Sequence, residues 1–484
     1  MKEIDIAIIT RRSIHGVFAL VSRTFIVRVV SLLSSFLLTV FLSPSVFGIF
    51  YVVSAAIAFL AYFSDIGLAA ALIQKKEPIT DEELKTTFTI QQVLVVSIVI
   101  LALLASKTIG SFYNLEKEGV LLFQALAIAF FLSSLKTIPS ILLERNLRFE
   151  KLVIPEIVES LAFYGTILFF AVQDYGITSF TYGVLARGLS GVLAIYIISP
   201  WKIRLGFSKI VAQRLLSFGI PFQANSILAL IKDDALTVYL GKILPLDQVG
   251  YIGFAQKIAF TPLRLIMDNI IRITFPSFAR LQNERKLLAI GIEKSIFSVA
   301  FFIFPSFFGL VLLFPYLIHL IPKYEKWEGA LISISFFAAN AIFSSISTPL
   351  TNALNAIGKI KITLYFMIFW TVTTWVLTPL SIMFFGFNGV AYTSAVISMS
   401  AIIVIYVAKR YIEFDVIKTV RYPLLASTIM GICLYFMRSI ITTNILNFVL
   451  VLIFGVIVYI GTMLVFAKSQ IIQDLKLIKK NISN

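Results

Sequence analysis

Long apolar blocks without charge recur along the whole chain, and their apolar residues do not alternate with polar ones. Val93–Ser106 and Phe448–Phe466, for example, contain no charged residue. A bilayer-spanning helix needs roughly 20 apolar residues, because it rises about 1.5 Å per residue through about 30 Å of hydrocarbon. A transmembrane barrel would instead show alternating segments of about 10 residues. The pattern therefore predicts an all-α integral membrane protein.

The blocks predict about 14 transmembrane helices, joined by connections too short to form a sizeable domain outside the membrane. Their approximate limits are residues 14–41, 46–74, 86–110, 119–143, 152–172, 177–199, 211–240, 248–276, 290–318, 328–356, 361–385, 388–408, 421–438 and 446–467. The first block is too long for a cleavable signal peptide and lacks a small-residue cleavage site, so we interpret it as the first span.

Composition agrees with a membrane protein and excludes several kinds of site. The 484 residues are 59% hydrophobic and only 14% charged, whereas soluble domains carry about 25% charged residues. Cys433 is the single cysteine, so it forms no intrachain disulfide, and we interpret it as a packing residue. With one cysteine and two histidines, most metal-binding patterns are excluded. We expect no cofactor and no metal.

Lysine and arginine are distributed unevenly over the two sides that the predicted spans define. If the N-terminus is cytoplasmic, 27 of the 41 basic residues are cytoplasmic and eight lie within spans, and the opposite side holds only Lys107, Lys117, Lys242, Lys323, Lys326 and Arg438. The positive-inside rule then places both termini in the cytoplasm of a multi-pass protein in the cell (inner or plasma) membrane. The net charge of +16 is a topology signal and an attraction to anionic membrane lipid. Because the basic residues are scattered, we expect no nucleic-acid partner.

Two connections resemble each other at an offset of 202 residues. Leu42–Phe50 reads LSPSVFGIF and Leu244–Ile252 reads LPLDQVGYI, so that Leu42 aligns with Leu244 and Gly48 with Gly250. Six spans separate the copies, which predicts two six-helix lobes in parallel orientation, a common transporter plan with the substrate site between the lobes. The lobes would be residues 1–205 and 206–412, followed by two additional helices and a cytoplasmic tail at 413–484. The alternative is chance similarity of two short loops.

Ionisable residues within the predicted spans are the strongest functional signal, since a charge at the bilayer centre costs about 2.5–3.5 kcal/mol and usually faces a cavity or a partner. The basic ones are Arg23, Arg28, Lys136, Arg187, Lys232, Lys257, Arg264 and Arg272, and the acidic ones are Asp65, Glu156, Glu159, Asp233, Asp234 and Asp268. In the eighth span, Lys257, Arg264 and Asp268 fall within roughly 40° on one helix face, and Arg272 lies about 40° further round.

Two interpretations of this charged face stay open. It is either a salt-bridge network that holds helices together, with Arg264 and Asp268 paired at i,i+4, or a hydrated cationic cavity for an anionic ligand. Arginine suits phosphate because its guanidinium binds two oxygens at once.

The intramembrane acids are candidates for binding a coupling ion. They are Asp65, Asp233, Asp234 and Asp268. A structural role for Asp65, as acceptor of a charge-assisted hydrogen bond, is the alternative. Neighbouring helix positions diverge by about 100°, so at most two of Lys232, Asp233 and Asp234 face one cavity.

Several stretches, spread over nearly the whole chain, carry a family resemblance. They are Leu42–Gly48, Ser64–Lys76, Leu143–Phe149, Ser217–Asp234, Leu244–Gly250, Phe275–Gln282, Thr348–Lys359 and Phe387–Tyr392. In this order they resemble the polysaccharide-transporter branch of the multidrug/oligosaccharidyl-lipid/polysaccharide exporter superfamily. The similarity is greatest to the lipopolysaccharide, colanic-acid and teichuronic-acid exporter type.

The resemblance implies a fold and a function. It implies two six-helix lobes around a central cavity, two extra C-terminal helices, and flipping of a polyprenyl-diphosphate-linked oligosaccharide from the cytoplasmic to the outer leaflet by alternating access. It implies cavity arginines that hold the diphosphate, a role that Arg23, Arg28 and Arg264 match by position, and Lys257 and Arg272 share the charged face. Coupling to an ion gradient or membrane potential is also implied. Partners would be membrane lipid and polysaccharide polymerase or glycosyltransferases.

Two other functions were weighed against this one. A drug/cation antiporter of the same superfamily would have twelve spans and an acid-dominated cavity. A membrane enzyme would need a sizeable outer loop, but the longest outer connection, around Lys107–Glu118, has only about a dozen residues. No nucleophile–base pair or metal motif is evident, so we expect that the protein is not an enzyme.

Overall fold

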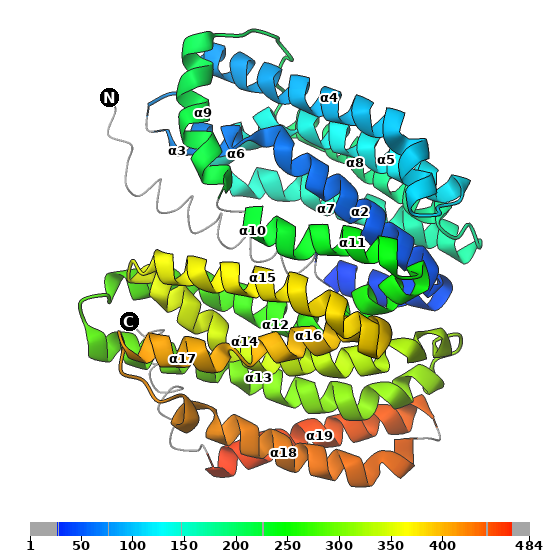
Figure 1. The fold of residues 1–484 in the computed structure, drawn as a ribbon, viewed down its shortest axis with the longest axis vertical. Coiled ribbons are helices and arrows are strands. Elements are labelled where there is room, and N and C mark those ends of the chain that lie inside the picture. Colours follow the sequence, from blue (N-terminus) through cyan, green and yellow to red (C-terminus); the bar gives the residue numbers. More distant parts are fainter. Residues whose placement is uncertain are drawn as a thin grey trace. The chain divides into compact units, whose positions relative to one another are not determined.

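The computed structural model describes residues 27, 29–75, 77–146, 148–224, 227–441 and 444–466. Within these ranges the secondary structure is helical, without strands, which confirms the all-α prediction. The chain forms two compact units, Met1–Gly250 and Tyr251–Asn484. Figure 1 shows the helices of each unit packed side by side along their length.

The first unit contains a short apolar helix, Val29–Phe41, and the following elements. They are α2 (Pro44–Asp65), α3 (Leu68–Gln74), α4 (Asp81–Phe112), α5 (Lys117–Leu135), α6 (Thr137–Arg145), α7 (Phe149–Val172), α8 (Thr178–Ile198), α9 (Lys209–Ala224), α10 (Ile227–Leu230), the π-helix η1 (Ile231–Ala235) and α11 (Leu236–Ile243). Helix α8 packs on α7 and α5, while α9 packs on α3 and α4 and α11 packs on α2.

The second unit begins within α12 (Leu246–Arg280) and contains nine further described elements. They are α13 (Arg285–Leu320), η2 (Glu325–Ala330), α14 (Leu331–Ala356), α15 (Ile360–Phe385), η3 (Gly386–Asn388), α16 (Gly389–Ser398), α17 (Ala401–Lys409), α18 (Val416–Ile441) and α19 (Ile445–Phe466). Helix α13 packs on α14 and α18, and α18 packs on α19.

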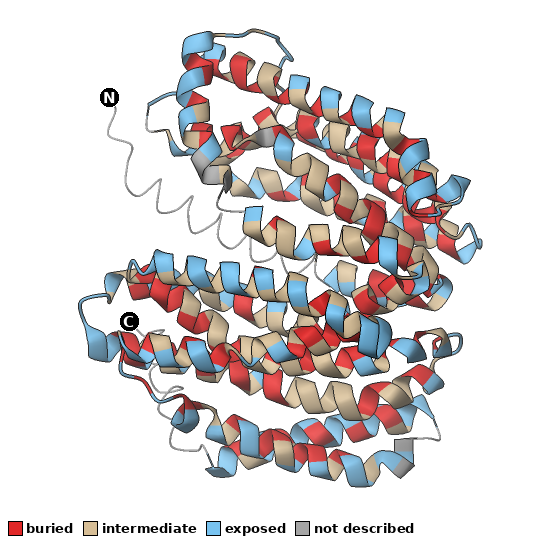
Figure 2. Ribbon diagram, viewed as in Figure 1, coloured by how far each residue is buried: buried red, intermediate tan, exposed pale blue. Residues whose placement is uncertain are grey.

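Ten helical stretches in the described part of the chain are long and apolar enough to cross a membrane. Their large apolar side chains are exposed over much of each helix, as the pale blue bands in Figure 2 show, with Leu104 76% and Ile197 79% exposed. Side chains of this kind are suited to lipid contact. The protein is therefore a multi-pass membrane protein, whereas the number of 14 spans and the boundaries of the two lobes stay predictions.

Several predicted spans are not the continuous helices that their apolar blocks indicated. The second is interrupted between α2 and α3, where Ile66 (φ 46°) and Gly67 (φ 72°) both adopt the left-handed conformation, which ends an α-helix. The fourth is divided at Lys136 into α5 and α6. The seventh includes the π-helix η1, and the twelfth is divided between α16 and α17.

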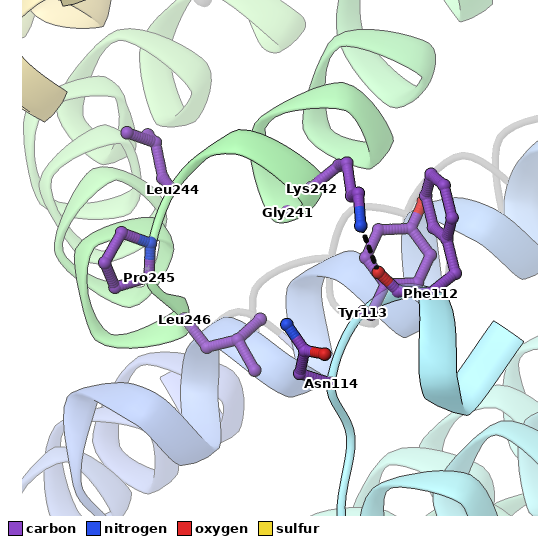
Figure 3. A pocket seen from close by; sticks show the side chains of 8 residues that line it. All are labelled: Phe112, Tyr113, Asn114, Gly241, Lys242, Leu244, Pro245 and Leu246. Carbon is purple, nitrogen blue, oxygen red and sulfur yellow. Dashed lines mark hydrogen bonds between the residues drawn. The ribbon is translucent and has the colours of Figure 1, made fainter.

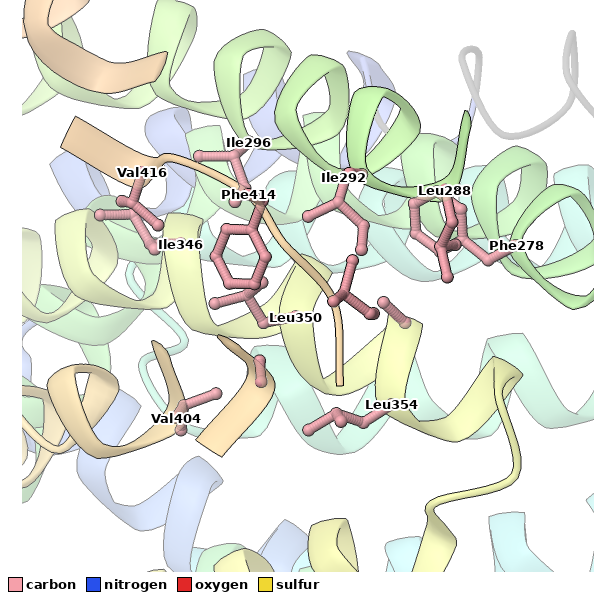
Figure 4. Close-up of a cluster of buried hydrophobic side chains, with 14 of the residues drawn as sticks. Phe278, Leu288, Ile292, Ile296, Ile346, Leu350, Leu354, Val404, Phe414 and Val416 are labelled. Atoms are coloured by element: carbon pink, nitrogen blue, oxygen red, sulfur yellow. The ribbon is translucent and has the colours of Figure 1, made fainter. Parts of the chain in front are cut away.

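A buried apolar cluster of the second unit joins α12, α13 and α14 (Figure 4). Phe278 of α12 packs there with Leu288 and Ile292 of α13, and Leu350 and Leu354 of α14. This cluster fixes the end of α12 against α13 and α14. A second contact of α12, Met267 against Val299, Ile303 and Ala341, holds the middle of the helix.

Helix α4 starts at a capping box that also gathers charge in the first unit. The Thr80 hydroxyl accepts from the Glu83 backbone N–H (3.3 Å), and the Glu83 carboxylate accepts from the Thr80 N–H (2.9 Å). The buried Glu83 carboxylate also accepts hydrogen bonds from Lys75 (2.8 Å) and from Arg214 of α9. The starts of α4 and α9 and the end of α3 are thereby tied together.

Candidate functional site

Helix α12 has one apolar and one polar face. Its apolar face packs through Phe260, Leu263, Met267 and Ile270 against α13 and α14. The polar face consists of Lys257, Arg264, Asp268 and Arg272, all of which are exposed; we call these four residues the polar stripe. At 1.5 Å per residue the stripe is about 22 Å long, most of the thickness of a bilayer core.

The polar stripe is the site that helical periodicity predicted, because residues spaced by three, four and seven positions share a helix face. Helix α12 is not among the ten stretches that are long and apolar enough to cross a membrane, because its polar and charged residues lower its hydropathy. Thr261, on the same face, donates its hydroxyl hydrogen to the Lys257 carbonyl oxygen (2.5 Å). The structure thus presents a long cationic surface with one acid, rather than a single charged point.

Three other predicted site residues have side chains outside the part of the chain that the structure describes. Arg23 and Arg28 lie outside the described residues. Asp65 is the last residue of α2, directly before the left-handed Ile66, and its side chain is also outside the described set. Their predicted roles therefore stay predictions.

Lys232, Asp233 and Asp234 form part of the π-helix η1, whereas the apolar block at residues 211–240 predicted a continuous span. Lys232 Nζ lies 3.5 Å from the Asp233 carboxylate, whose side chain is 70% exposed. Asp234 is half-buried. Single π-turns inside α-helices are frequent at functional sites. Three charged residues lie in this one, so Asp233 and Asp234 remain candidates for binding a coupling ion.

A third group of charges from the predicted spans joins helices of the first unit, with Glu159 buried and the Arg187 side chain 57% exposed. Lys136 Nζ lies 2.5 Å from Glu159 Oε1, and Arg187 Nε lies 3.6 Å from Glu159 Oε2. Glu159 is buried between α7 and α8, with 8% of its surface exposed. Glu159 forms ion pairs with both cations, so the interpretation of intramembrane charges as a salt-bridge network applies to this group.

Two pairs of glycines bring helices of the first unit into close contact. A side chain on Gly48 would collide with the Leu246 carbonyl oxygen, and one on Gly250 would collide with the Pro44 carbonyl oxygen. These glycines are the ones that align at an offset of 202 in the two similar connections. Gly67 similarly meets Gly219 of α9.

A small cavity of about 170 Å³ lies where α4 ends and α11 leads into α12 (Figure 3). Lys242 Nζ donates to the Phe112 carbonyl oxygen there (2.8 Å) and lies 4.2 Å from the Phe112 ring centre. Tyr113 is buried beside it and donates to the Val238 carbonyl oxygen (3.2 Å). None of the predicted site residues lines this cavity.

Metal chemistry gains no support from the part of the chain that the structure describes, where no cluster of three or more potential ligand residues occurs.

The fold is that of known membrane transporters. A solved structure of the lipid II flippase MurJ in an inward closed conformation matches 95% of this chain and 100% of its own, with a TM-score of 0.77 at 18% identity. An inward-facing multidrug resistance MATE family transporter of the MOP superfamily matches 78% of this chain and 94% of its own, with a TM-score of 0.60 at 13% identity. At these identities the likeness defines the fold class alone.

The sequence defines the family. The family described as "Polysaccharide biosynthesis protein" matches residues 37–331, and this chain belongs to that family. The predicted resemblance to polysaccharide exporters is thereby confirmed.

Relatives agree with this assignment. The chain is 25% identical over 354 residues to an uncharacterized membrane protein in the cps region of Klebsiella pneumoniae, covering 72% of this chain and 71% of the relative. It is 25% identical to the lipopolysaccharide biosynthesis protein WzxC of Escherichia coli, covering 67% and 66%. It is 24% identical to the teichuronic acid biosynthesis protein TuaB of Bacillus subtilis, covering 62% of each. The matches to WzxC and TuaB span slightly less than two thirds of those proteins.

Proposed function

We propose that this protein is a flippase that moves a lipid-diphosphate-linked oligosaccharide from the cytoplasmic to the outer leaflet by alternating access. The family and the MurJ-like fold support the class of substrate. In this proposal the protein transports its substrate without changing it chemically, and polysaccharide polymerase or glycosyltransferases act before or after it. Both termini would be cytoplasmic in the inner or plasma membrane.

The observation that carries the proposal is the polar stripe of α12. Arg264 and Arg272 are exposed, and an exposed arginine in a membrane helix requires water, a partner or a ligand. The guanidinium group matches phosphate oxygens bidentately, so the two arginines and Lys257 would hold the diphosphate while the sugar passes. Arg23 and Arg28 are proposed to take part from the first span.

Acids of the proposed pathway would bind the coupling ion. Asp268 lies within the polar stripe, and Asp233 and Asp234 lie in η1. Asp65, at the end of α2, is the fourth candidate. Protonation or cation binding at such a carboxylate would make the path more positive and strengthen binding of the anionic substrate, and loss of the proton or cation would favour its release.

The test is a flipping assay in liposomes with a lipid-diphosphate oligosaccharide, with and without an imposed membrane potential. We expect protein-dependent appearance of the sugar on the receiving leaflet, and a drop of at least tenfold in the Arg264→Gln/Arg272→Gln variant. Arg280→Gln is the matched control, because Arg280 is an exposed arginine in the last turn of α12 and outside the polar stripe.

Two outcomes would reject the proposal. Full activity of the double variant would remove the polar stripe from the mechanism. Absence of flipping together with proton-coupled efflux of a small organic cation would instead favour the drug/cation antiporter, and Asp65, Asp233 and Asp234 would then be the residues to replace.

A further inference from the structure

A cavity of about 280 Å³ lies between α3 and α6 in the first unit, and none of its lining residues belongs to the polar stripe. The two short helices pack side by side (Figure 1). Helix α3 contributes an apolar wall through Ala69 and Ile73, and the Ile73 side chain is 38% exposed. The cavity is therefore open beside an apolar surface.

The opposite wall is polar and comes from the end of α5 and from α6. This wall of the cavity is formed by Ser133, Lys136, Thr137, Ser140 and Glu144. Their spacing of three, four and seven residues places them along one helix face. Lys136, which joins α5 to α6, and Glu144, in the last turn of α6, are eight residues and so about 12 Å apart along the chain direction, with the hydroxyl groups of Thr137 and Ser140 between them.

The Lys136 end of the cavity has an excess of positive charge. Among the described residues, the Glu159 carboxylate pairs with both Lys136 (2.5 Å) and Arg187 (3.6 Å), so two cations share this one carboxylate. The Lys136 ammonium has three N–H donors, and a single one is needed for Glu159. Its remaining donors can reach an anionic group in the cavity.

The Glu144 end carries a carboxyl group that forms no ion pair with any described residue. Among the described residues no ion pair or side-chain hydrogen bond involves this carboxylate, and burial raises its pKa above the ordinary value. Its neighbour Arg145 is engaged elsewhere, since it donates to the carbonyl oxygens of Leu72 (2.8 Å) and Lys75 (2.7 Å). Those bonds fix the end of α6 to α3 and keep the two walls together.

We propose that this cavity binds the headgroup of a zwitterionic phospholipid that has a primary amine. The phosphate would lie at Lys136 and the hydroxyl groups, the ammonium at Glu144, and the acyl chains along the apolar wall at Ile73. A dipolar ligand fits because the cavity has one charge of each sign at opposite ends, and a hydrogen-bonded ion pair in a partly buried site is favourable only when both charges are matched. The predicted topology places Glu144 at the cytoplasmic end of its span, which is the depth of lipid headgroups.

The test compares phosphatidylethanolamine with phosphatidylcholine of the same acyl chains, using full-length protein in detergent and native mass spectrometry. We expect at least tenfold tighter binding of phosphatidylethanolamine, because the trimethylammonium group of phosphatidylcholine has no N–H to donate. Glu144→Gln is expected to abolish this preference. Glu150→Gln, an exposed carboxylate in the first turn of α7, is expected to retain it, and lipid-free melting curves verify that each variant is folded.

Two further measurements make the result decisive. Ser140→Ala removes one hydroxyl without changing charge and should weaken phosphatidylethanolamine binding about threefold to tenfold, the loss of one hydrogen bond. Water-soluble glycerophosphoethanolamine should compete with the lipid, which shows that the headgroup is recognised. Equal binding of the two lipids, an unchanged preference in Glu144→Gln, or stronger binding of phosphatidylglycerol than of phosphatidylethanolamine would overturn the proposal.

Discussion

Two sets of charged residues inside predicted spans, the Lys136–Glu159 pair and the arginines of the polar stripe, have opposite surroundings. In the first unit, Glu159 is buried and paired with Lys136. In the second unit, Arg264 and Arg272 of α12 are exposed along a helix whose other face is packed. The same sequence signal, an ionisable residue within an apolar block, therefore corresponds to helix packing in one region and to an accessible surface in the other.

This difference has a physical basis. A buried ion pair is tolerated because each charge replaces the water lost by the other, so removing one partner leaves an uncompensated charge. An exposed charge keeps its surrounding water, so it does not need a counter-charge from a neighbouring residue. We therefore expect substitutions in the first unit to change stability and those on the polar stripe to change transport.

The largest expected effect on stability is that of Glu159→Gln. The uncharged amide leaves Lys136 partly buried without its counter-ion, and we expect the free energy of unfolding to fall by about 3 kcal/mol. Chemical denaturation in detergent would measure it. The Lys136→Met/Glu159→Leu double variant should recover most of the loss, since both charges are gone. Equal losses in the single and double variants would contradict the pairing.

Close backbone contacts in the first unit allow the stability effect of packing to be compared with that of charge pairing. Gly48→Ala should lower the free energy of unfolding by about 1–3 kcal/mol, because its methyl group collides with the Leu246 carbonyl oxygen. Gly165→Ala in α7 is the matched control. Its methyl group meets no neighbouring atom, so helix propensity should stabilise the protein by about 0.5–1 kcal/mol. The same sign for both variants would contradict this packing.

Arg214→Gln is an intermediate case within the first unit, because the Arg214 side chain is 58% exposed while its partner Glu83 is 1% exposed. Glu83 keeps its bonds from Lys75 and Thr80, so we expect a loss of about 1 kcal/mol. Arg204→Gln is the control, since Arg204 and Asp81 are both 55% exposed and 3.7 Å apart. It should change stability by less than about 0.5 kcal/mol. A larger effect of Arg204→Gln would show that burial is not the deciding variable.

The smallest effect on stability is expected for the Arg264→Gln/Arg272→Gln variant, which loses the most transport. Exposed substitutions usually change stability by less than about 0.5 kcal/mol, so its denaturation midpoint should match that of the unmodified protein. A loss comparable to that of Glu159→Gln would mean that the stripe, too, holds helices together.

Much of this fold was predictable from apolar blocks, and the polar stripe was predictable from helical periodicity. Lys257, Arg264 and Asp268 are local to one helix, so spacing alone places them on one face. The pairing of Lys136 with Glu159 was not predictable, because it depends on how α5, α6 and α7 pack. The sequence showed both charges but not their proximity.

The breaks within helices were missed for a different reason. Ile66 is an apolar β-branched residue and gives no sign of its left-handed conformation, which such residues rarely adopt. The following Gly67 was the available signal. The π-helix η1 had a weaker one, the run Lys232-Asp233-Asp234, since three consecutive charges are unusual within a membrane helix.

The contact between the two similar connections is reciprocal. Gly48 meets residue 246 and Gly250 meets residue 44, and both pairs are related by the same offset of 202. Surfaces that meet in this crosswise way resemble an isologous contact, the kind found in twofold-symmetric dimers. The two glycines are separate positions of one chain, so each side of this contact can be altered alone.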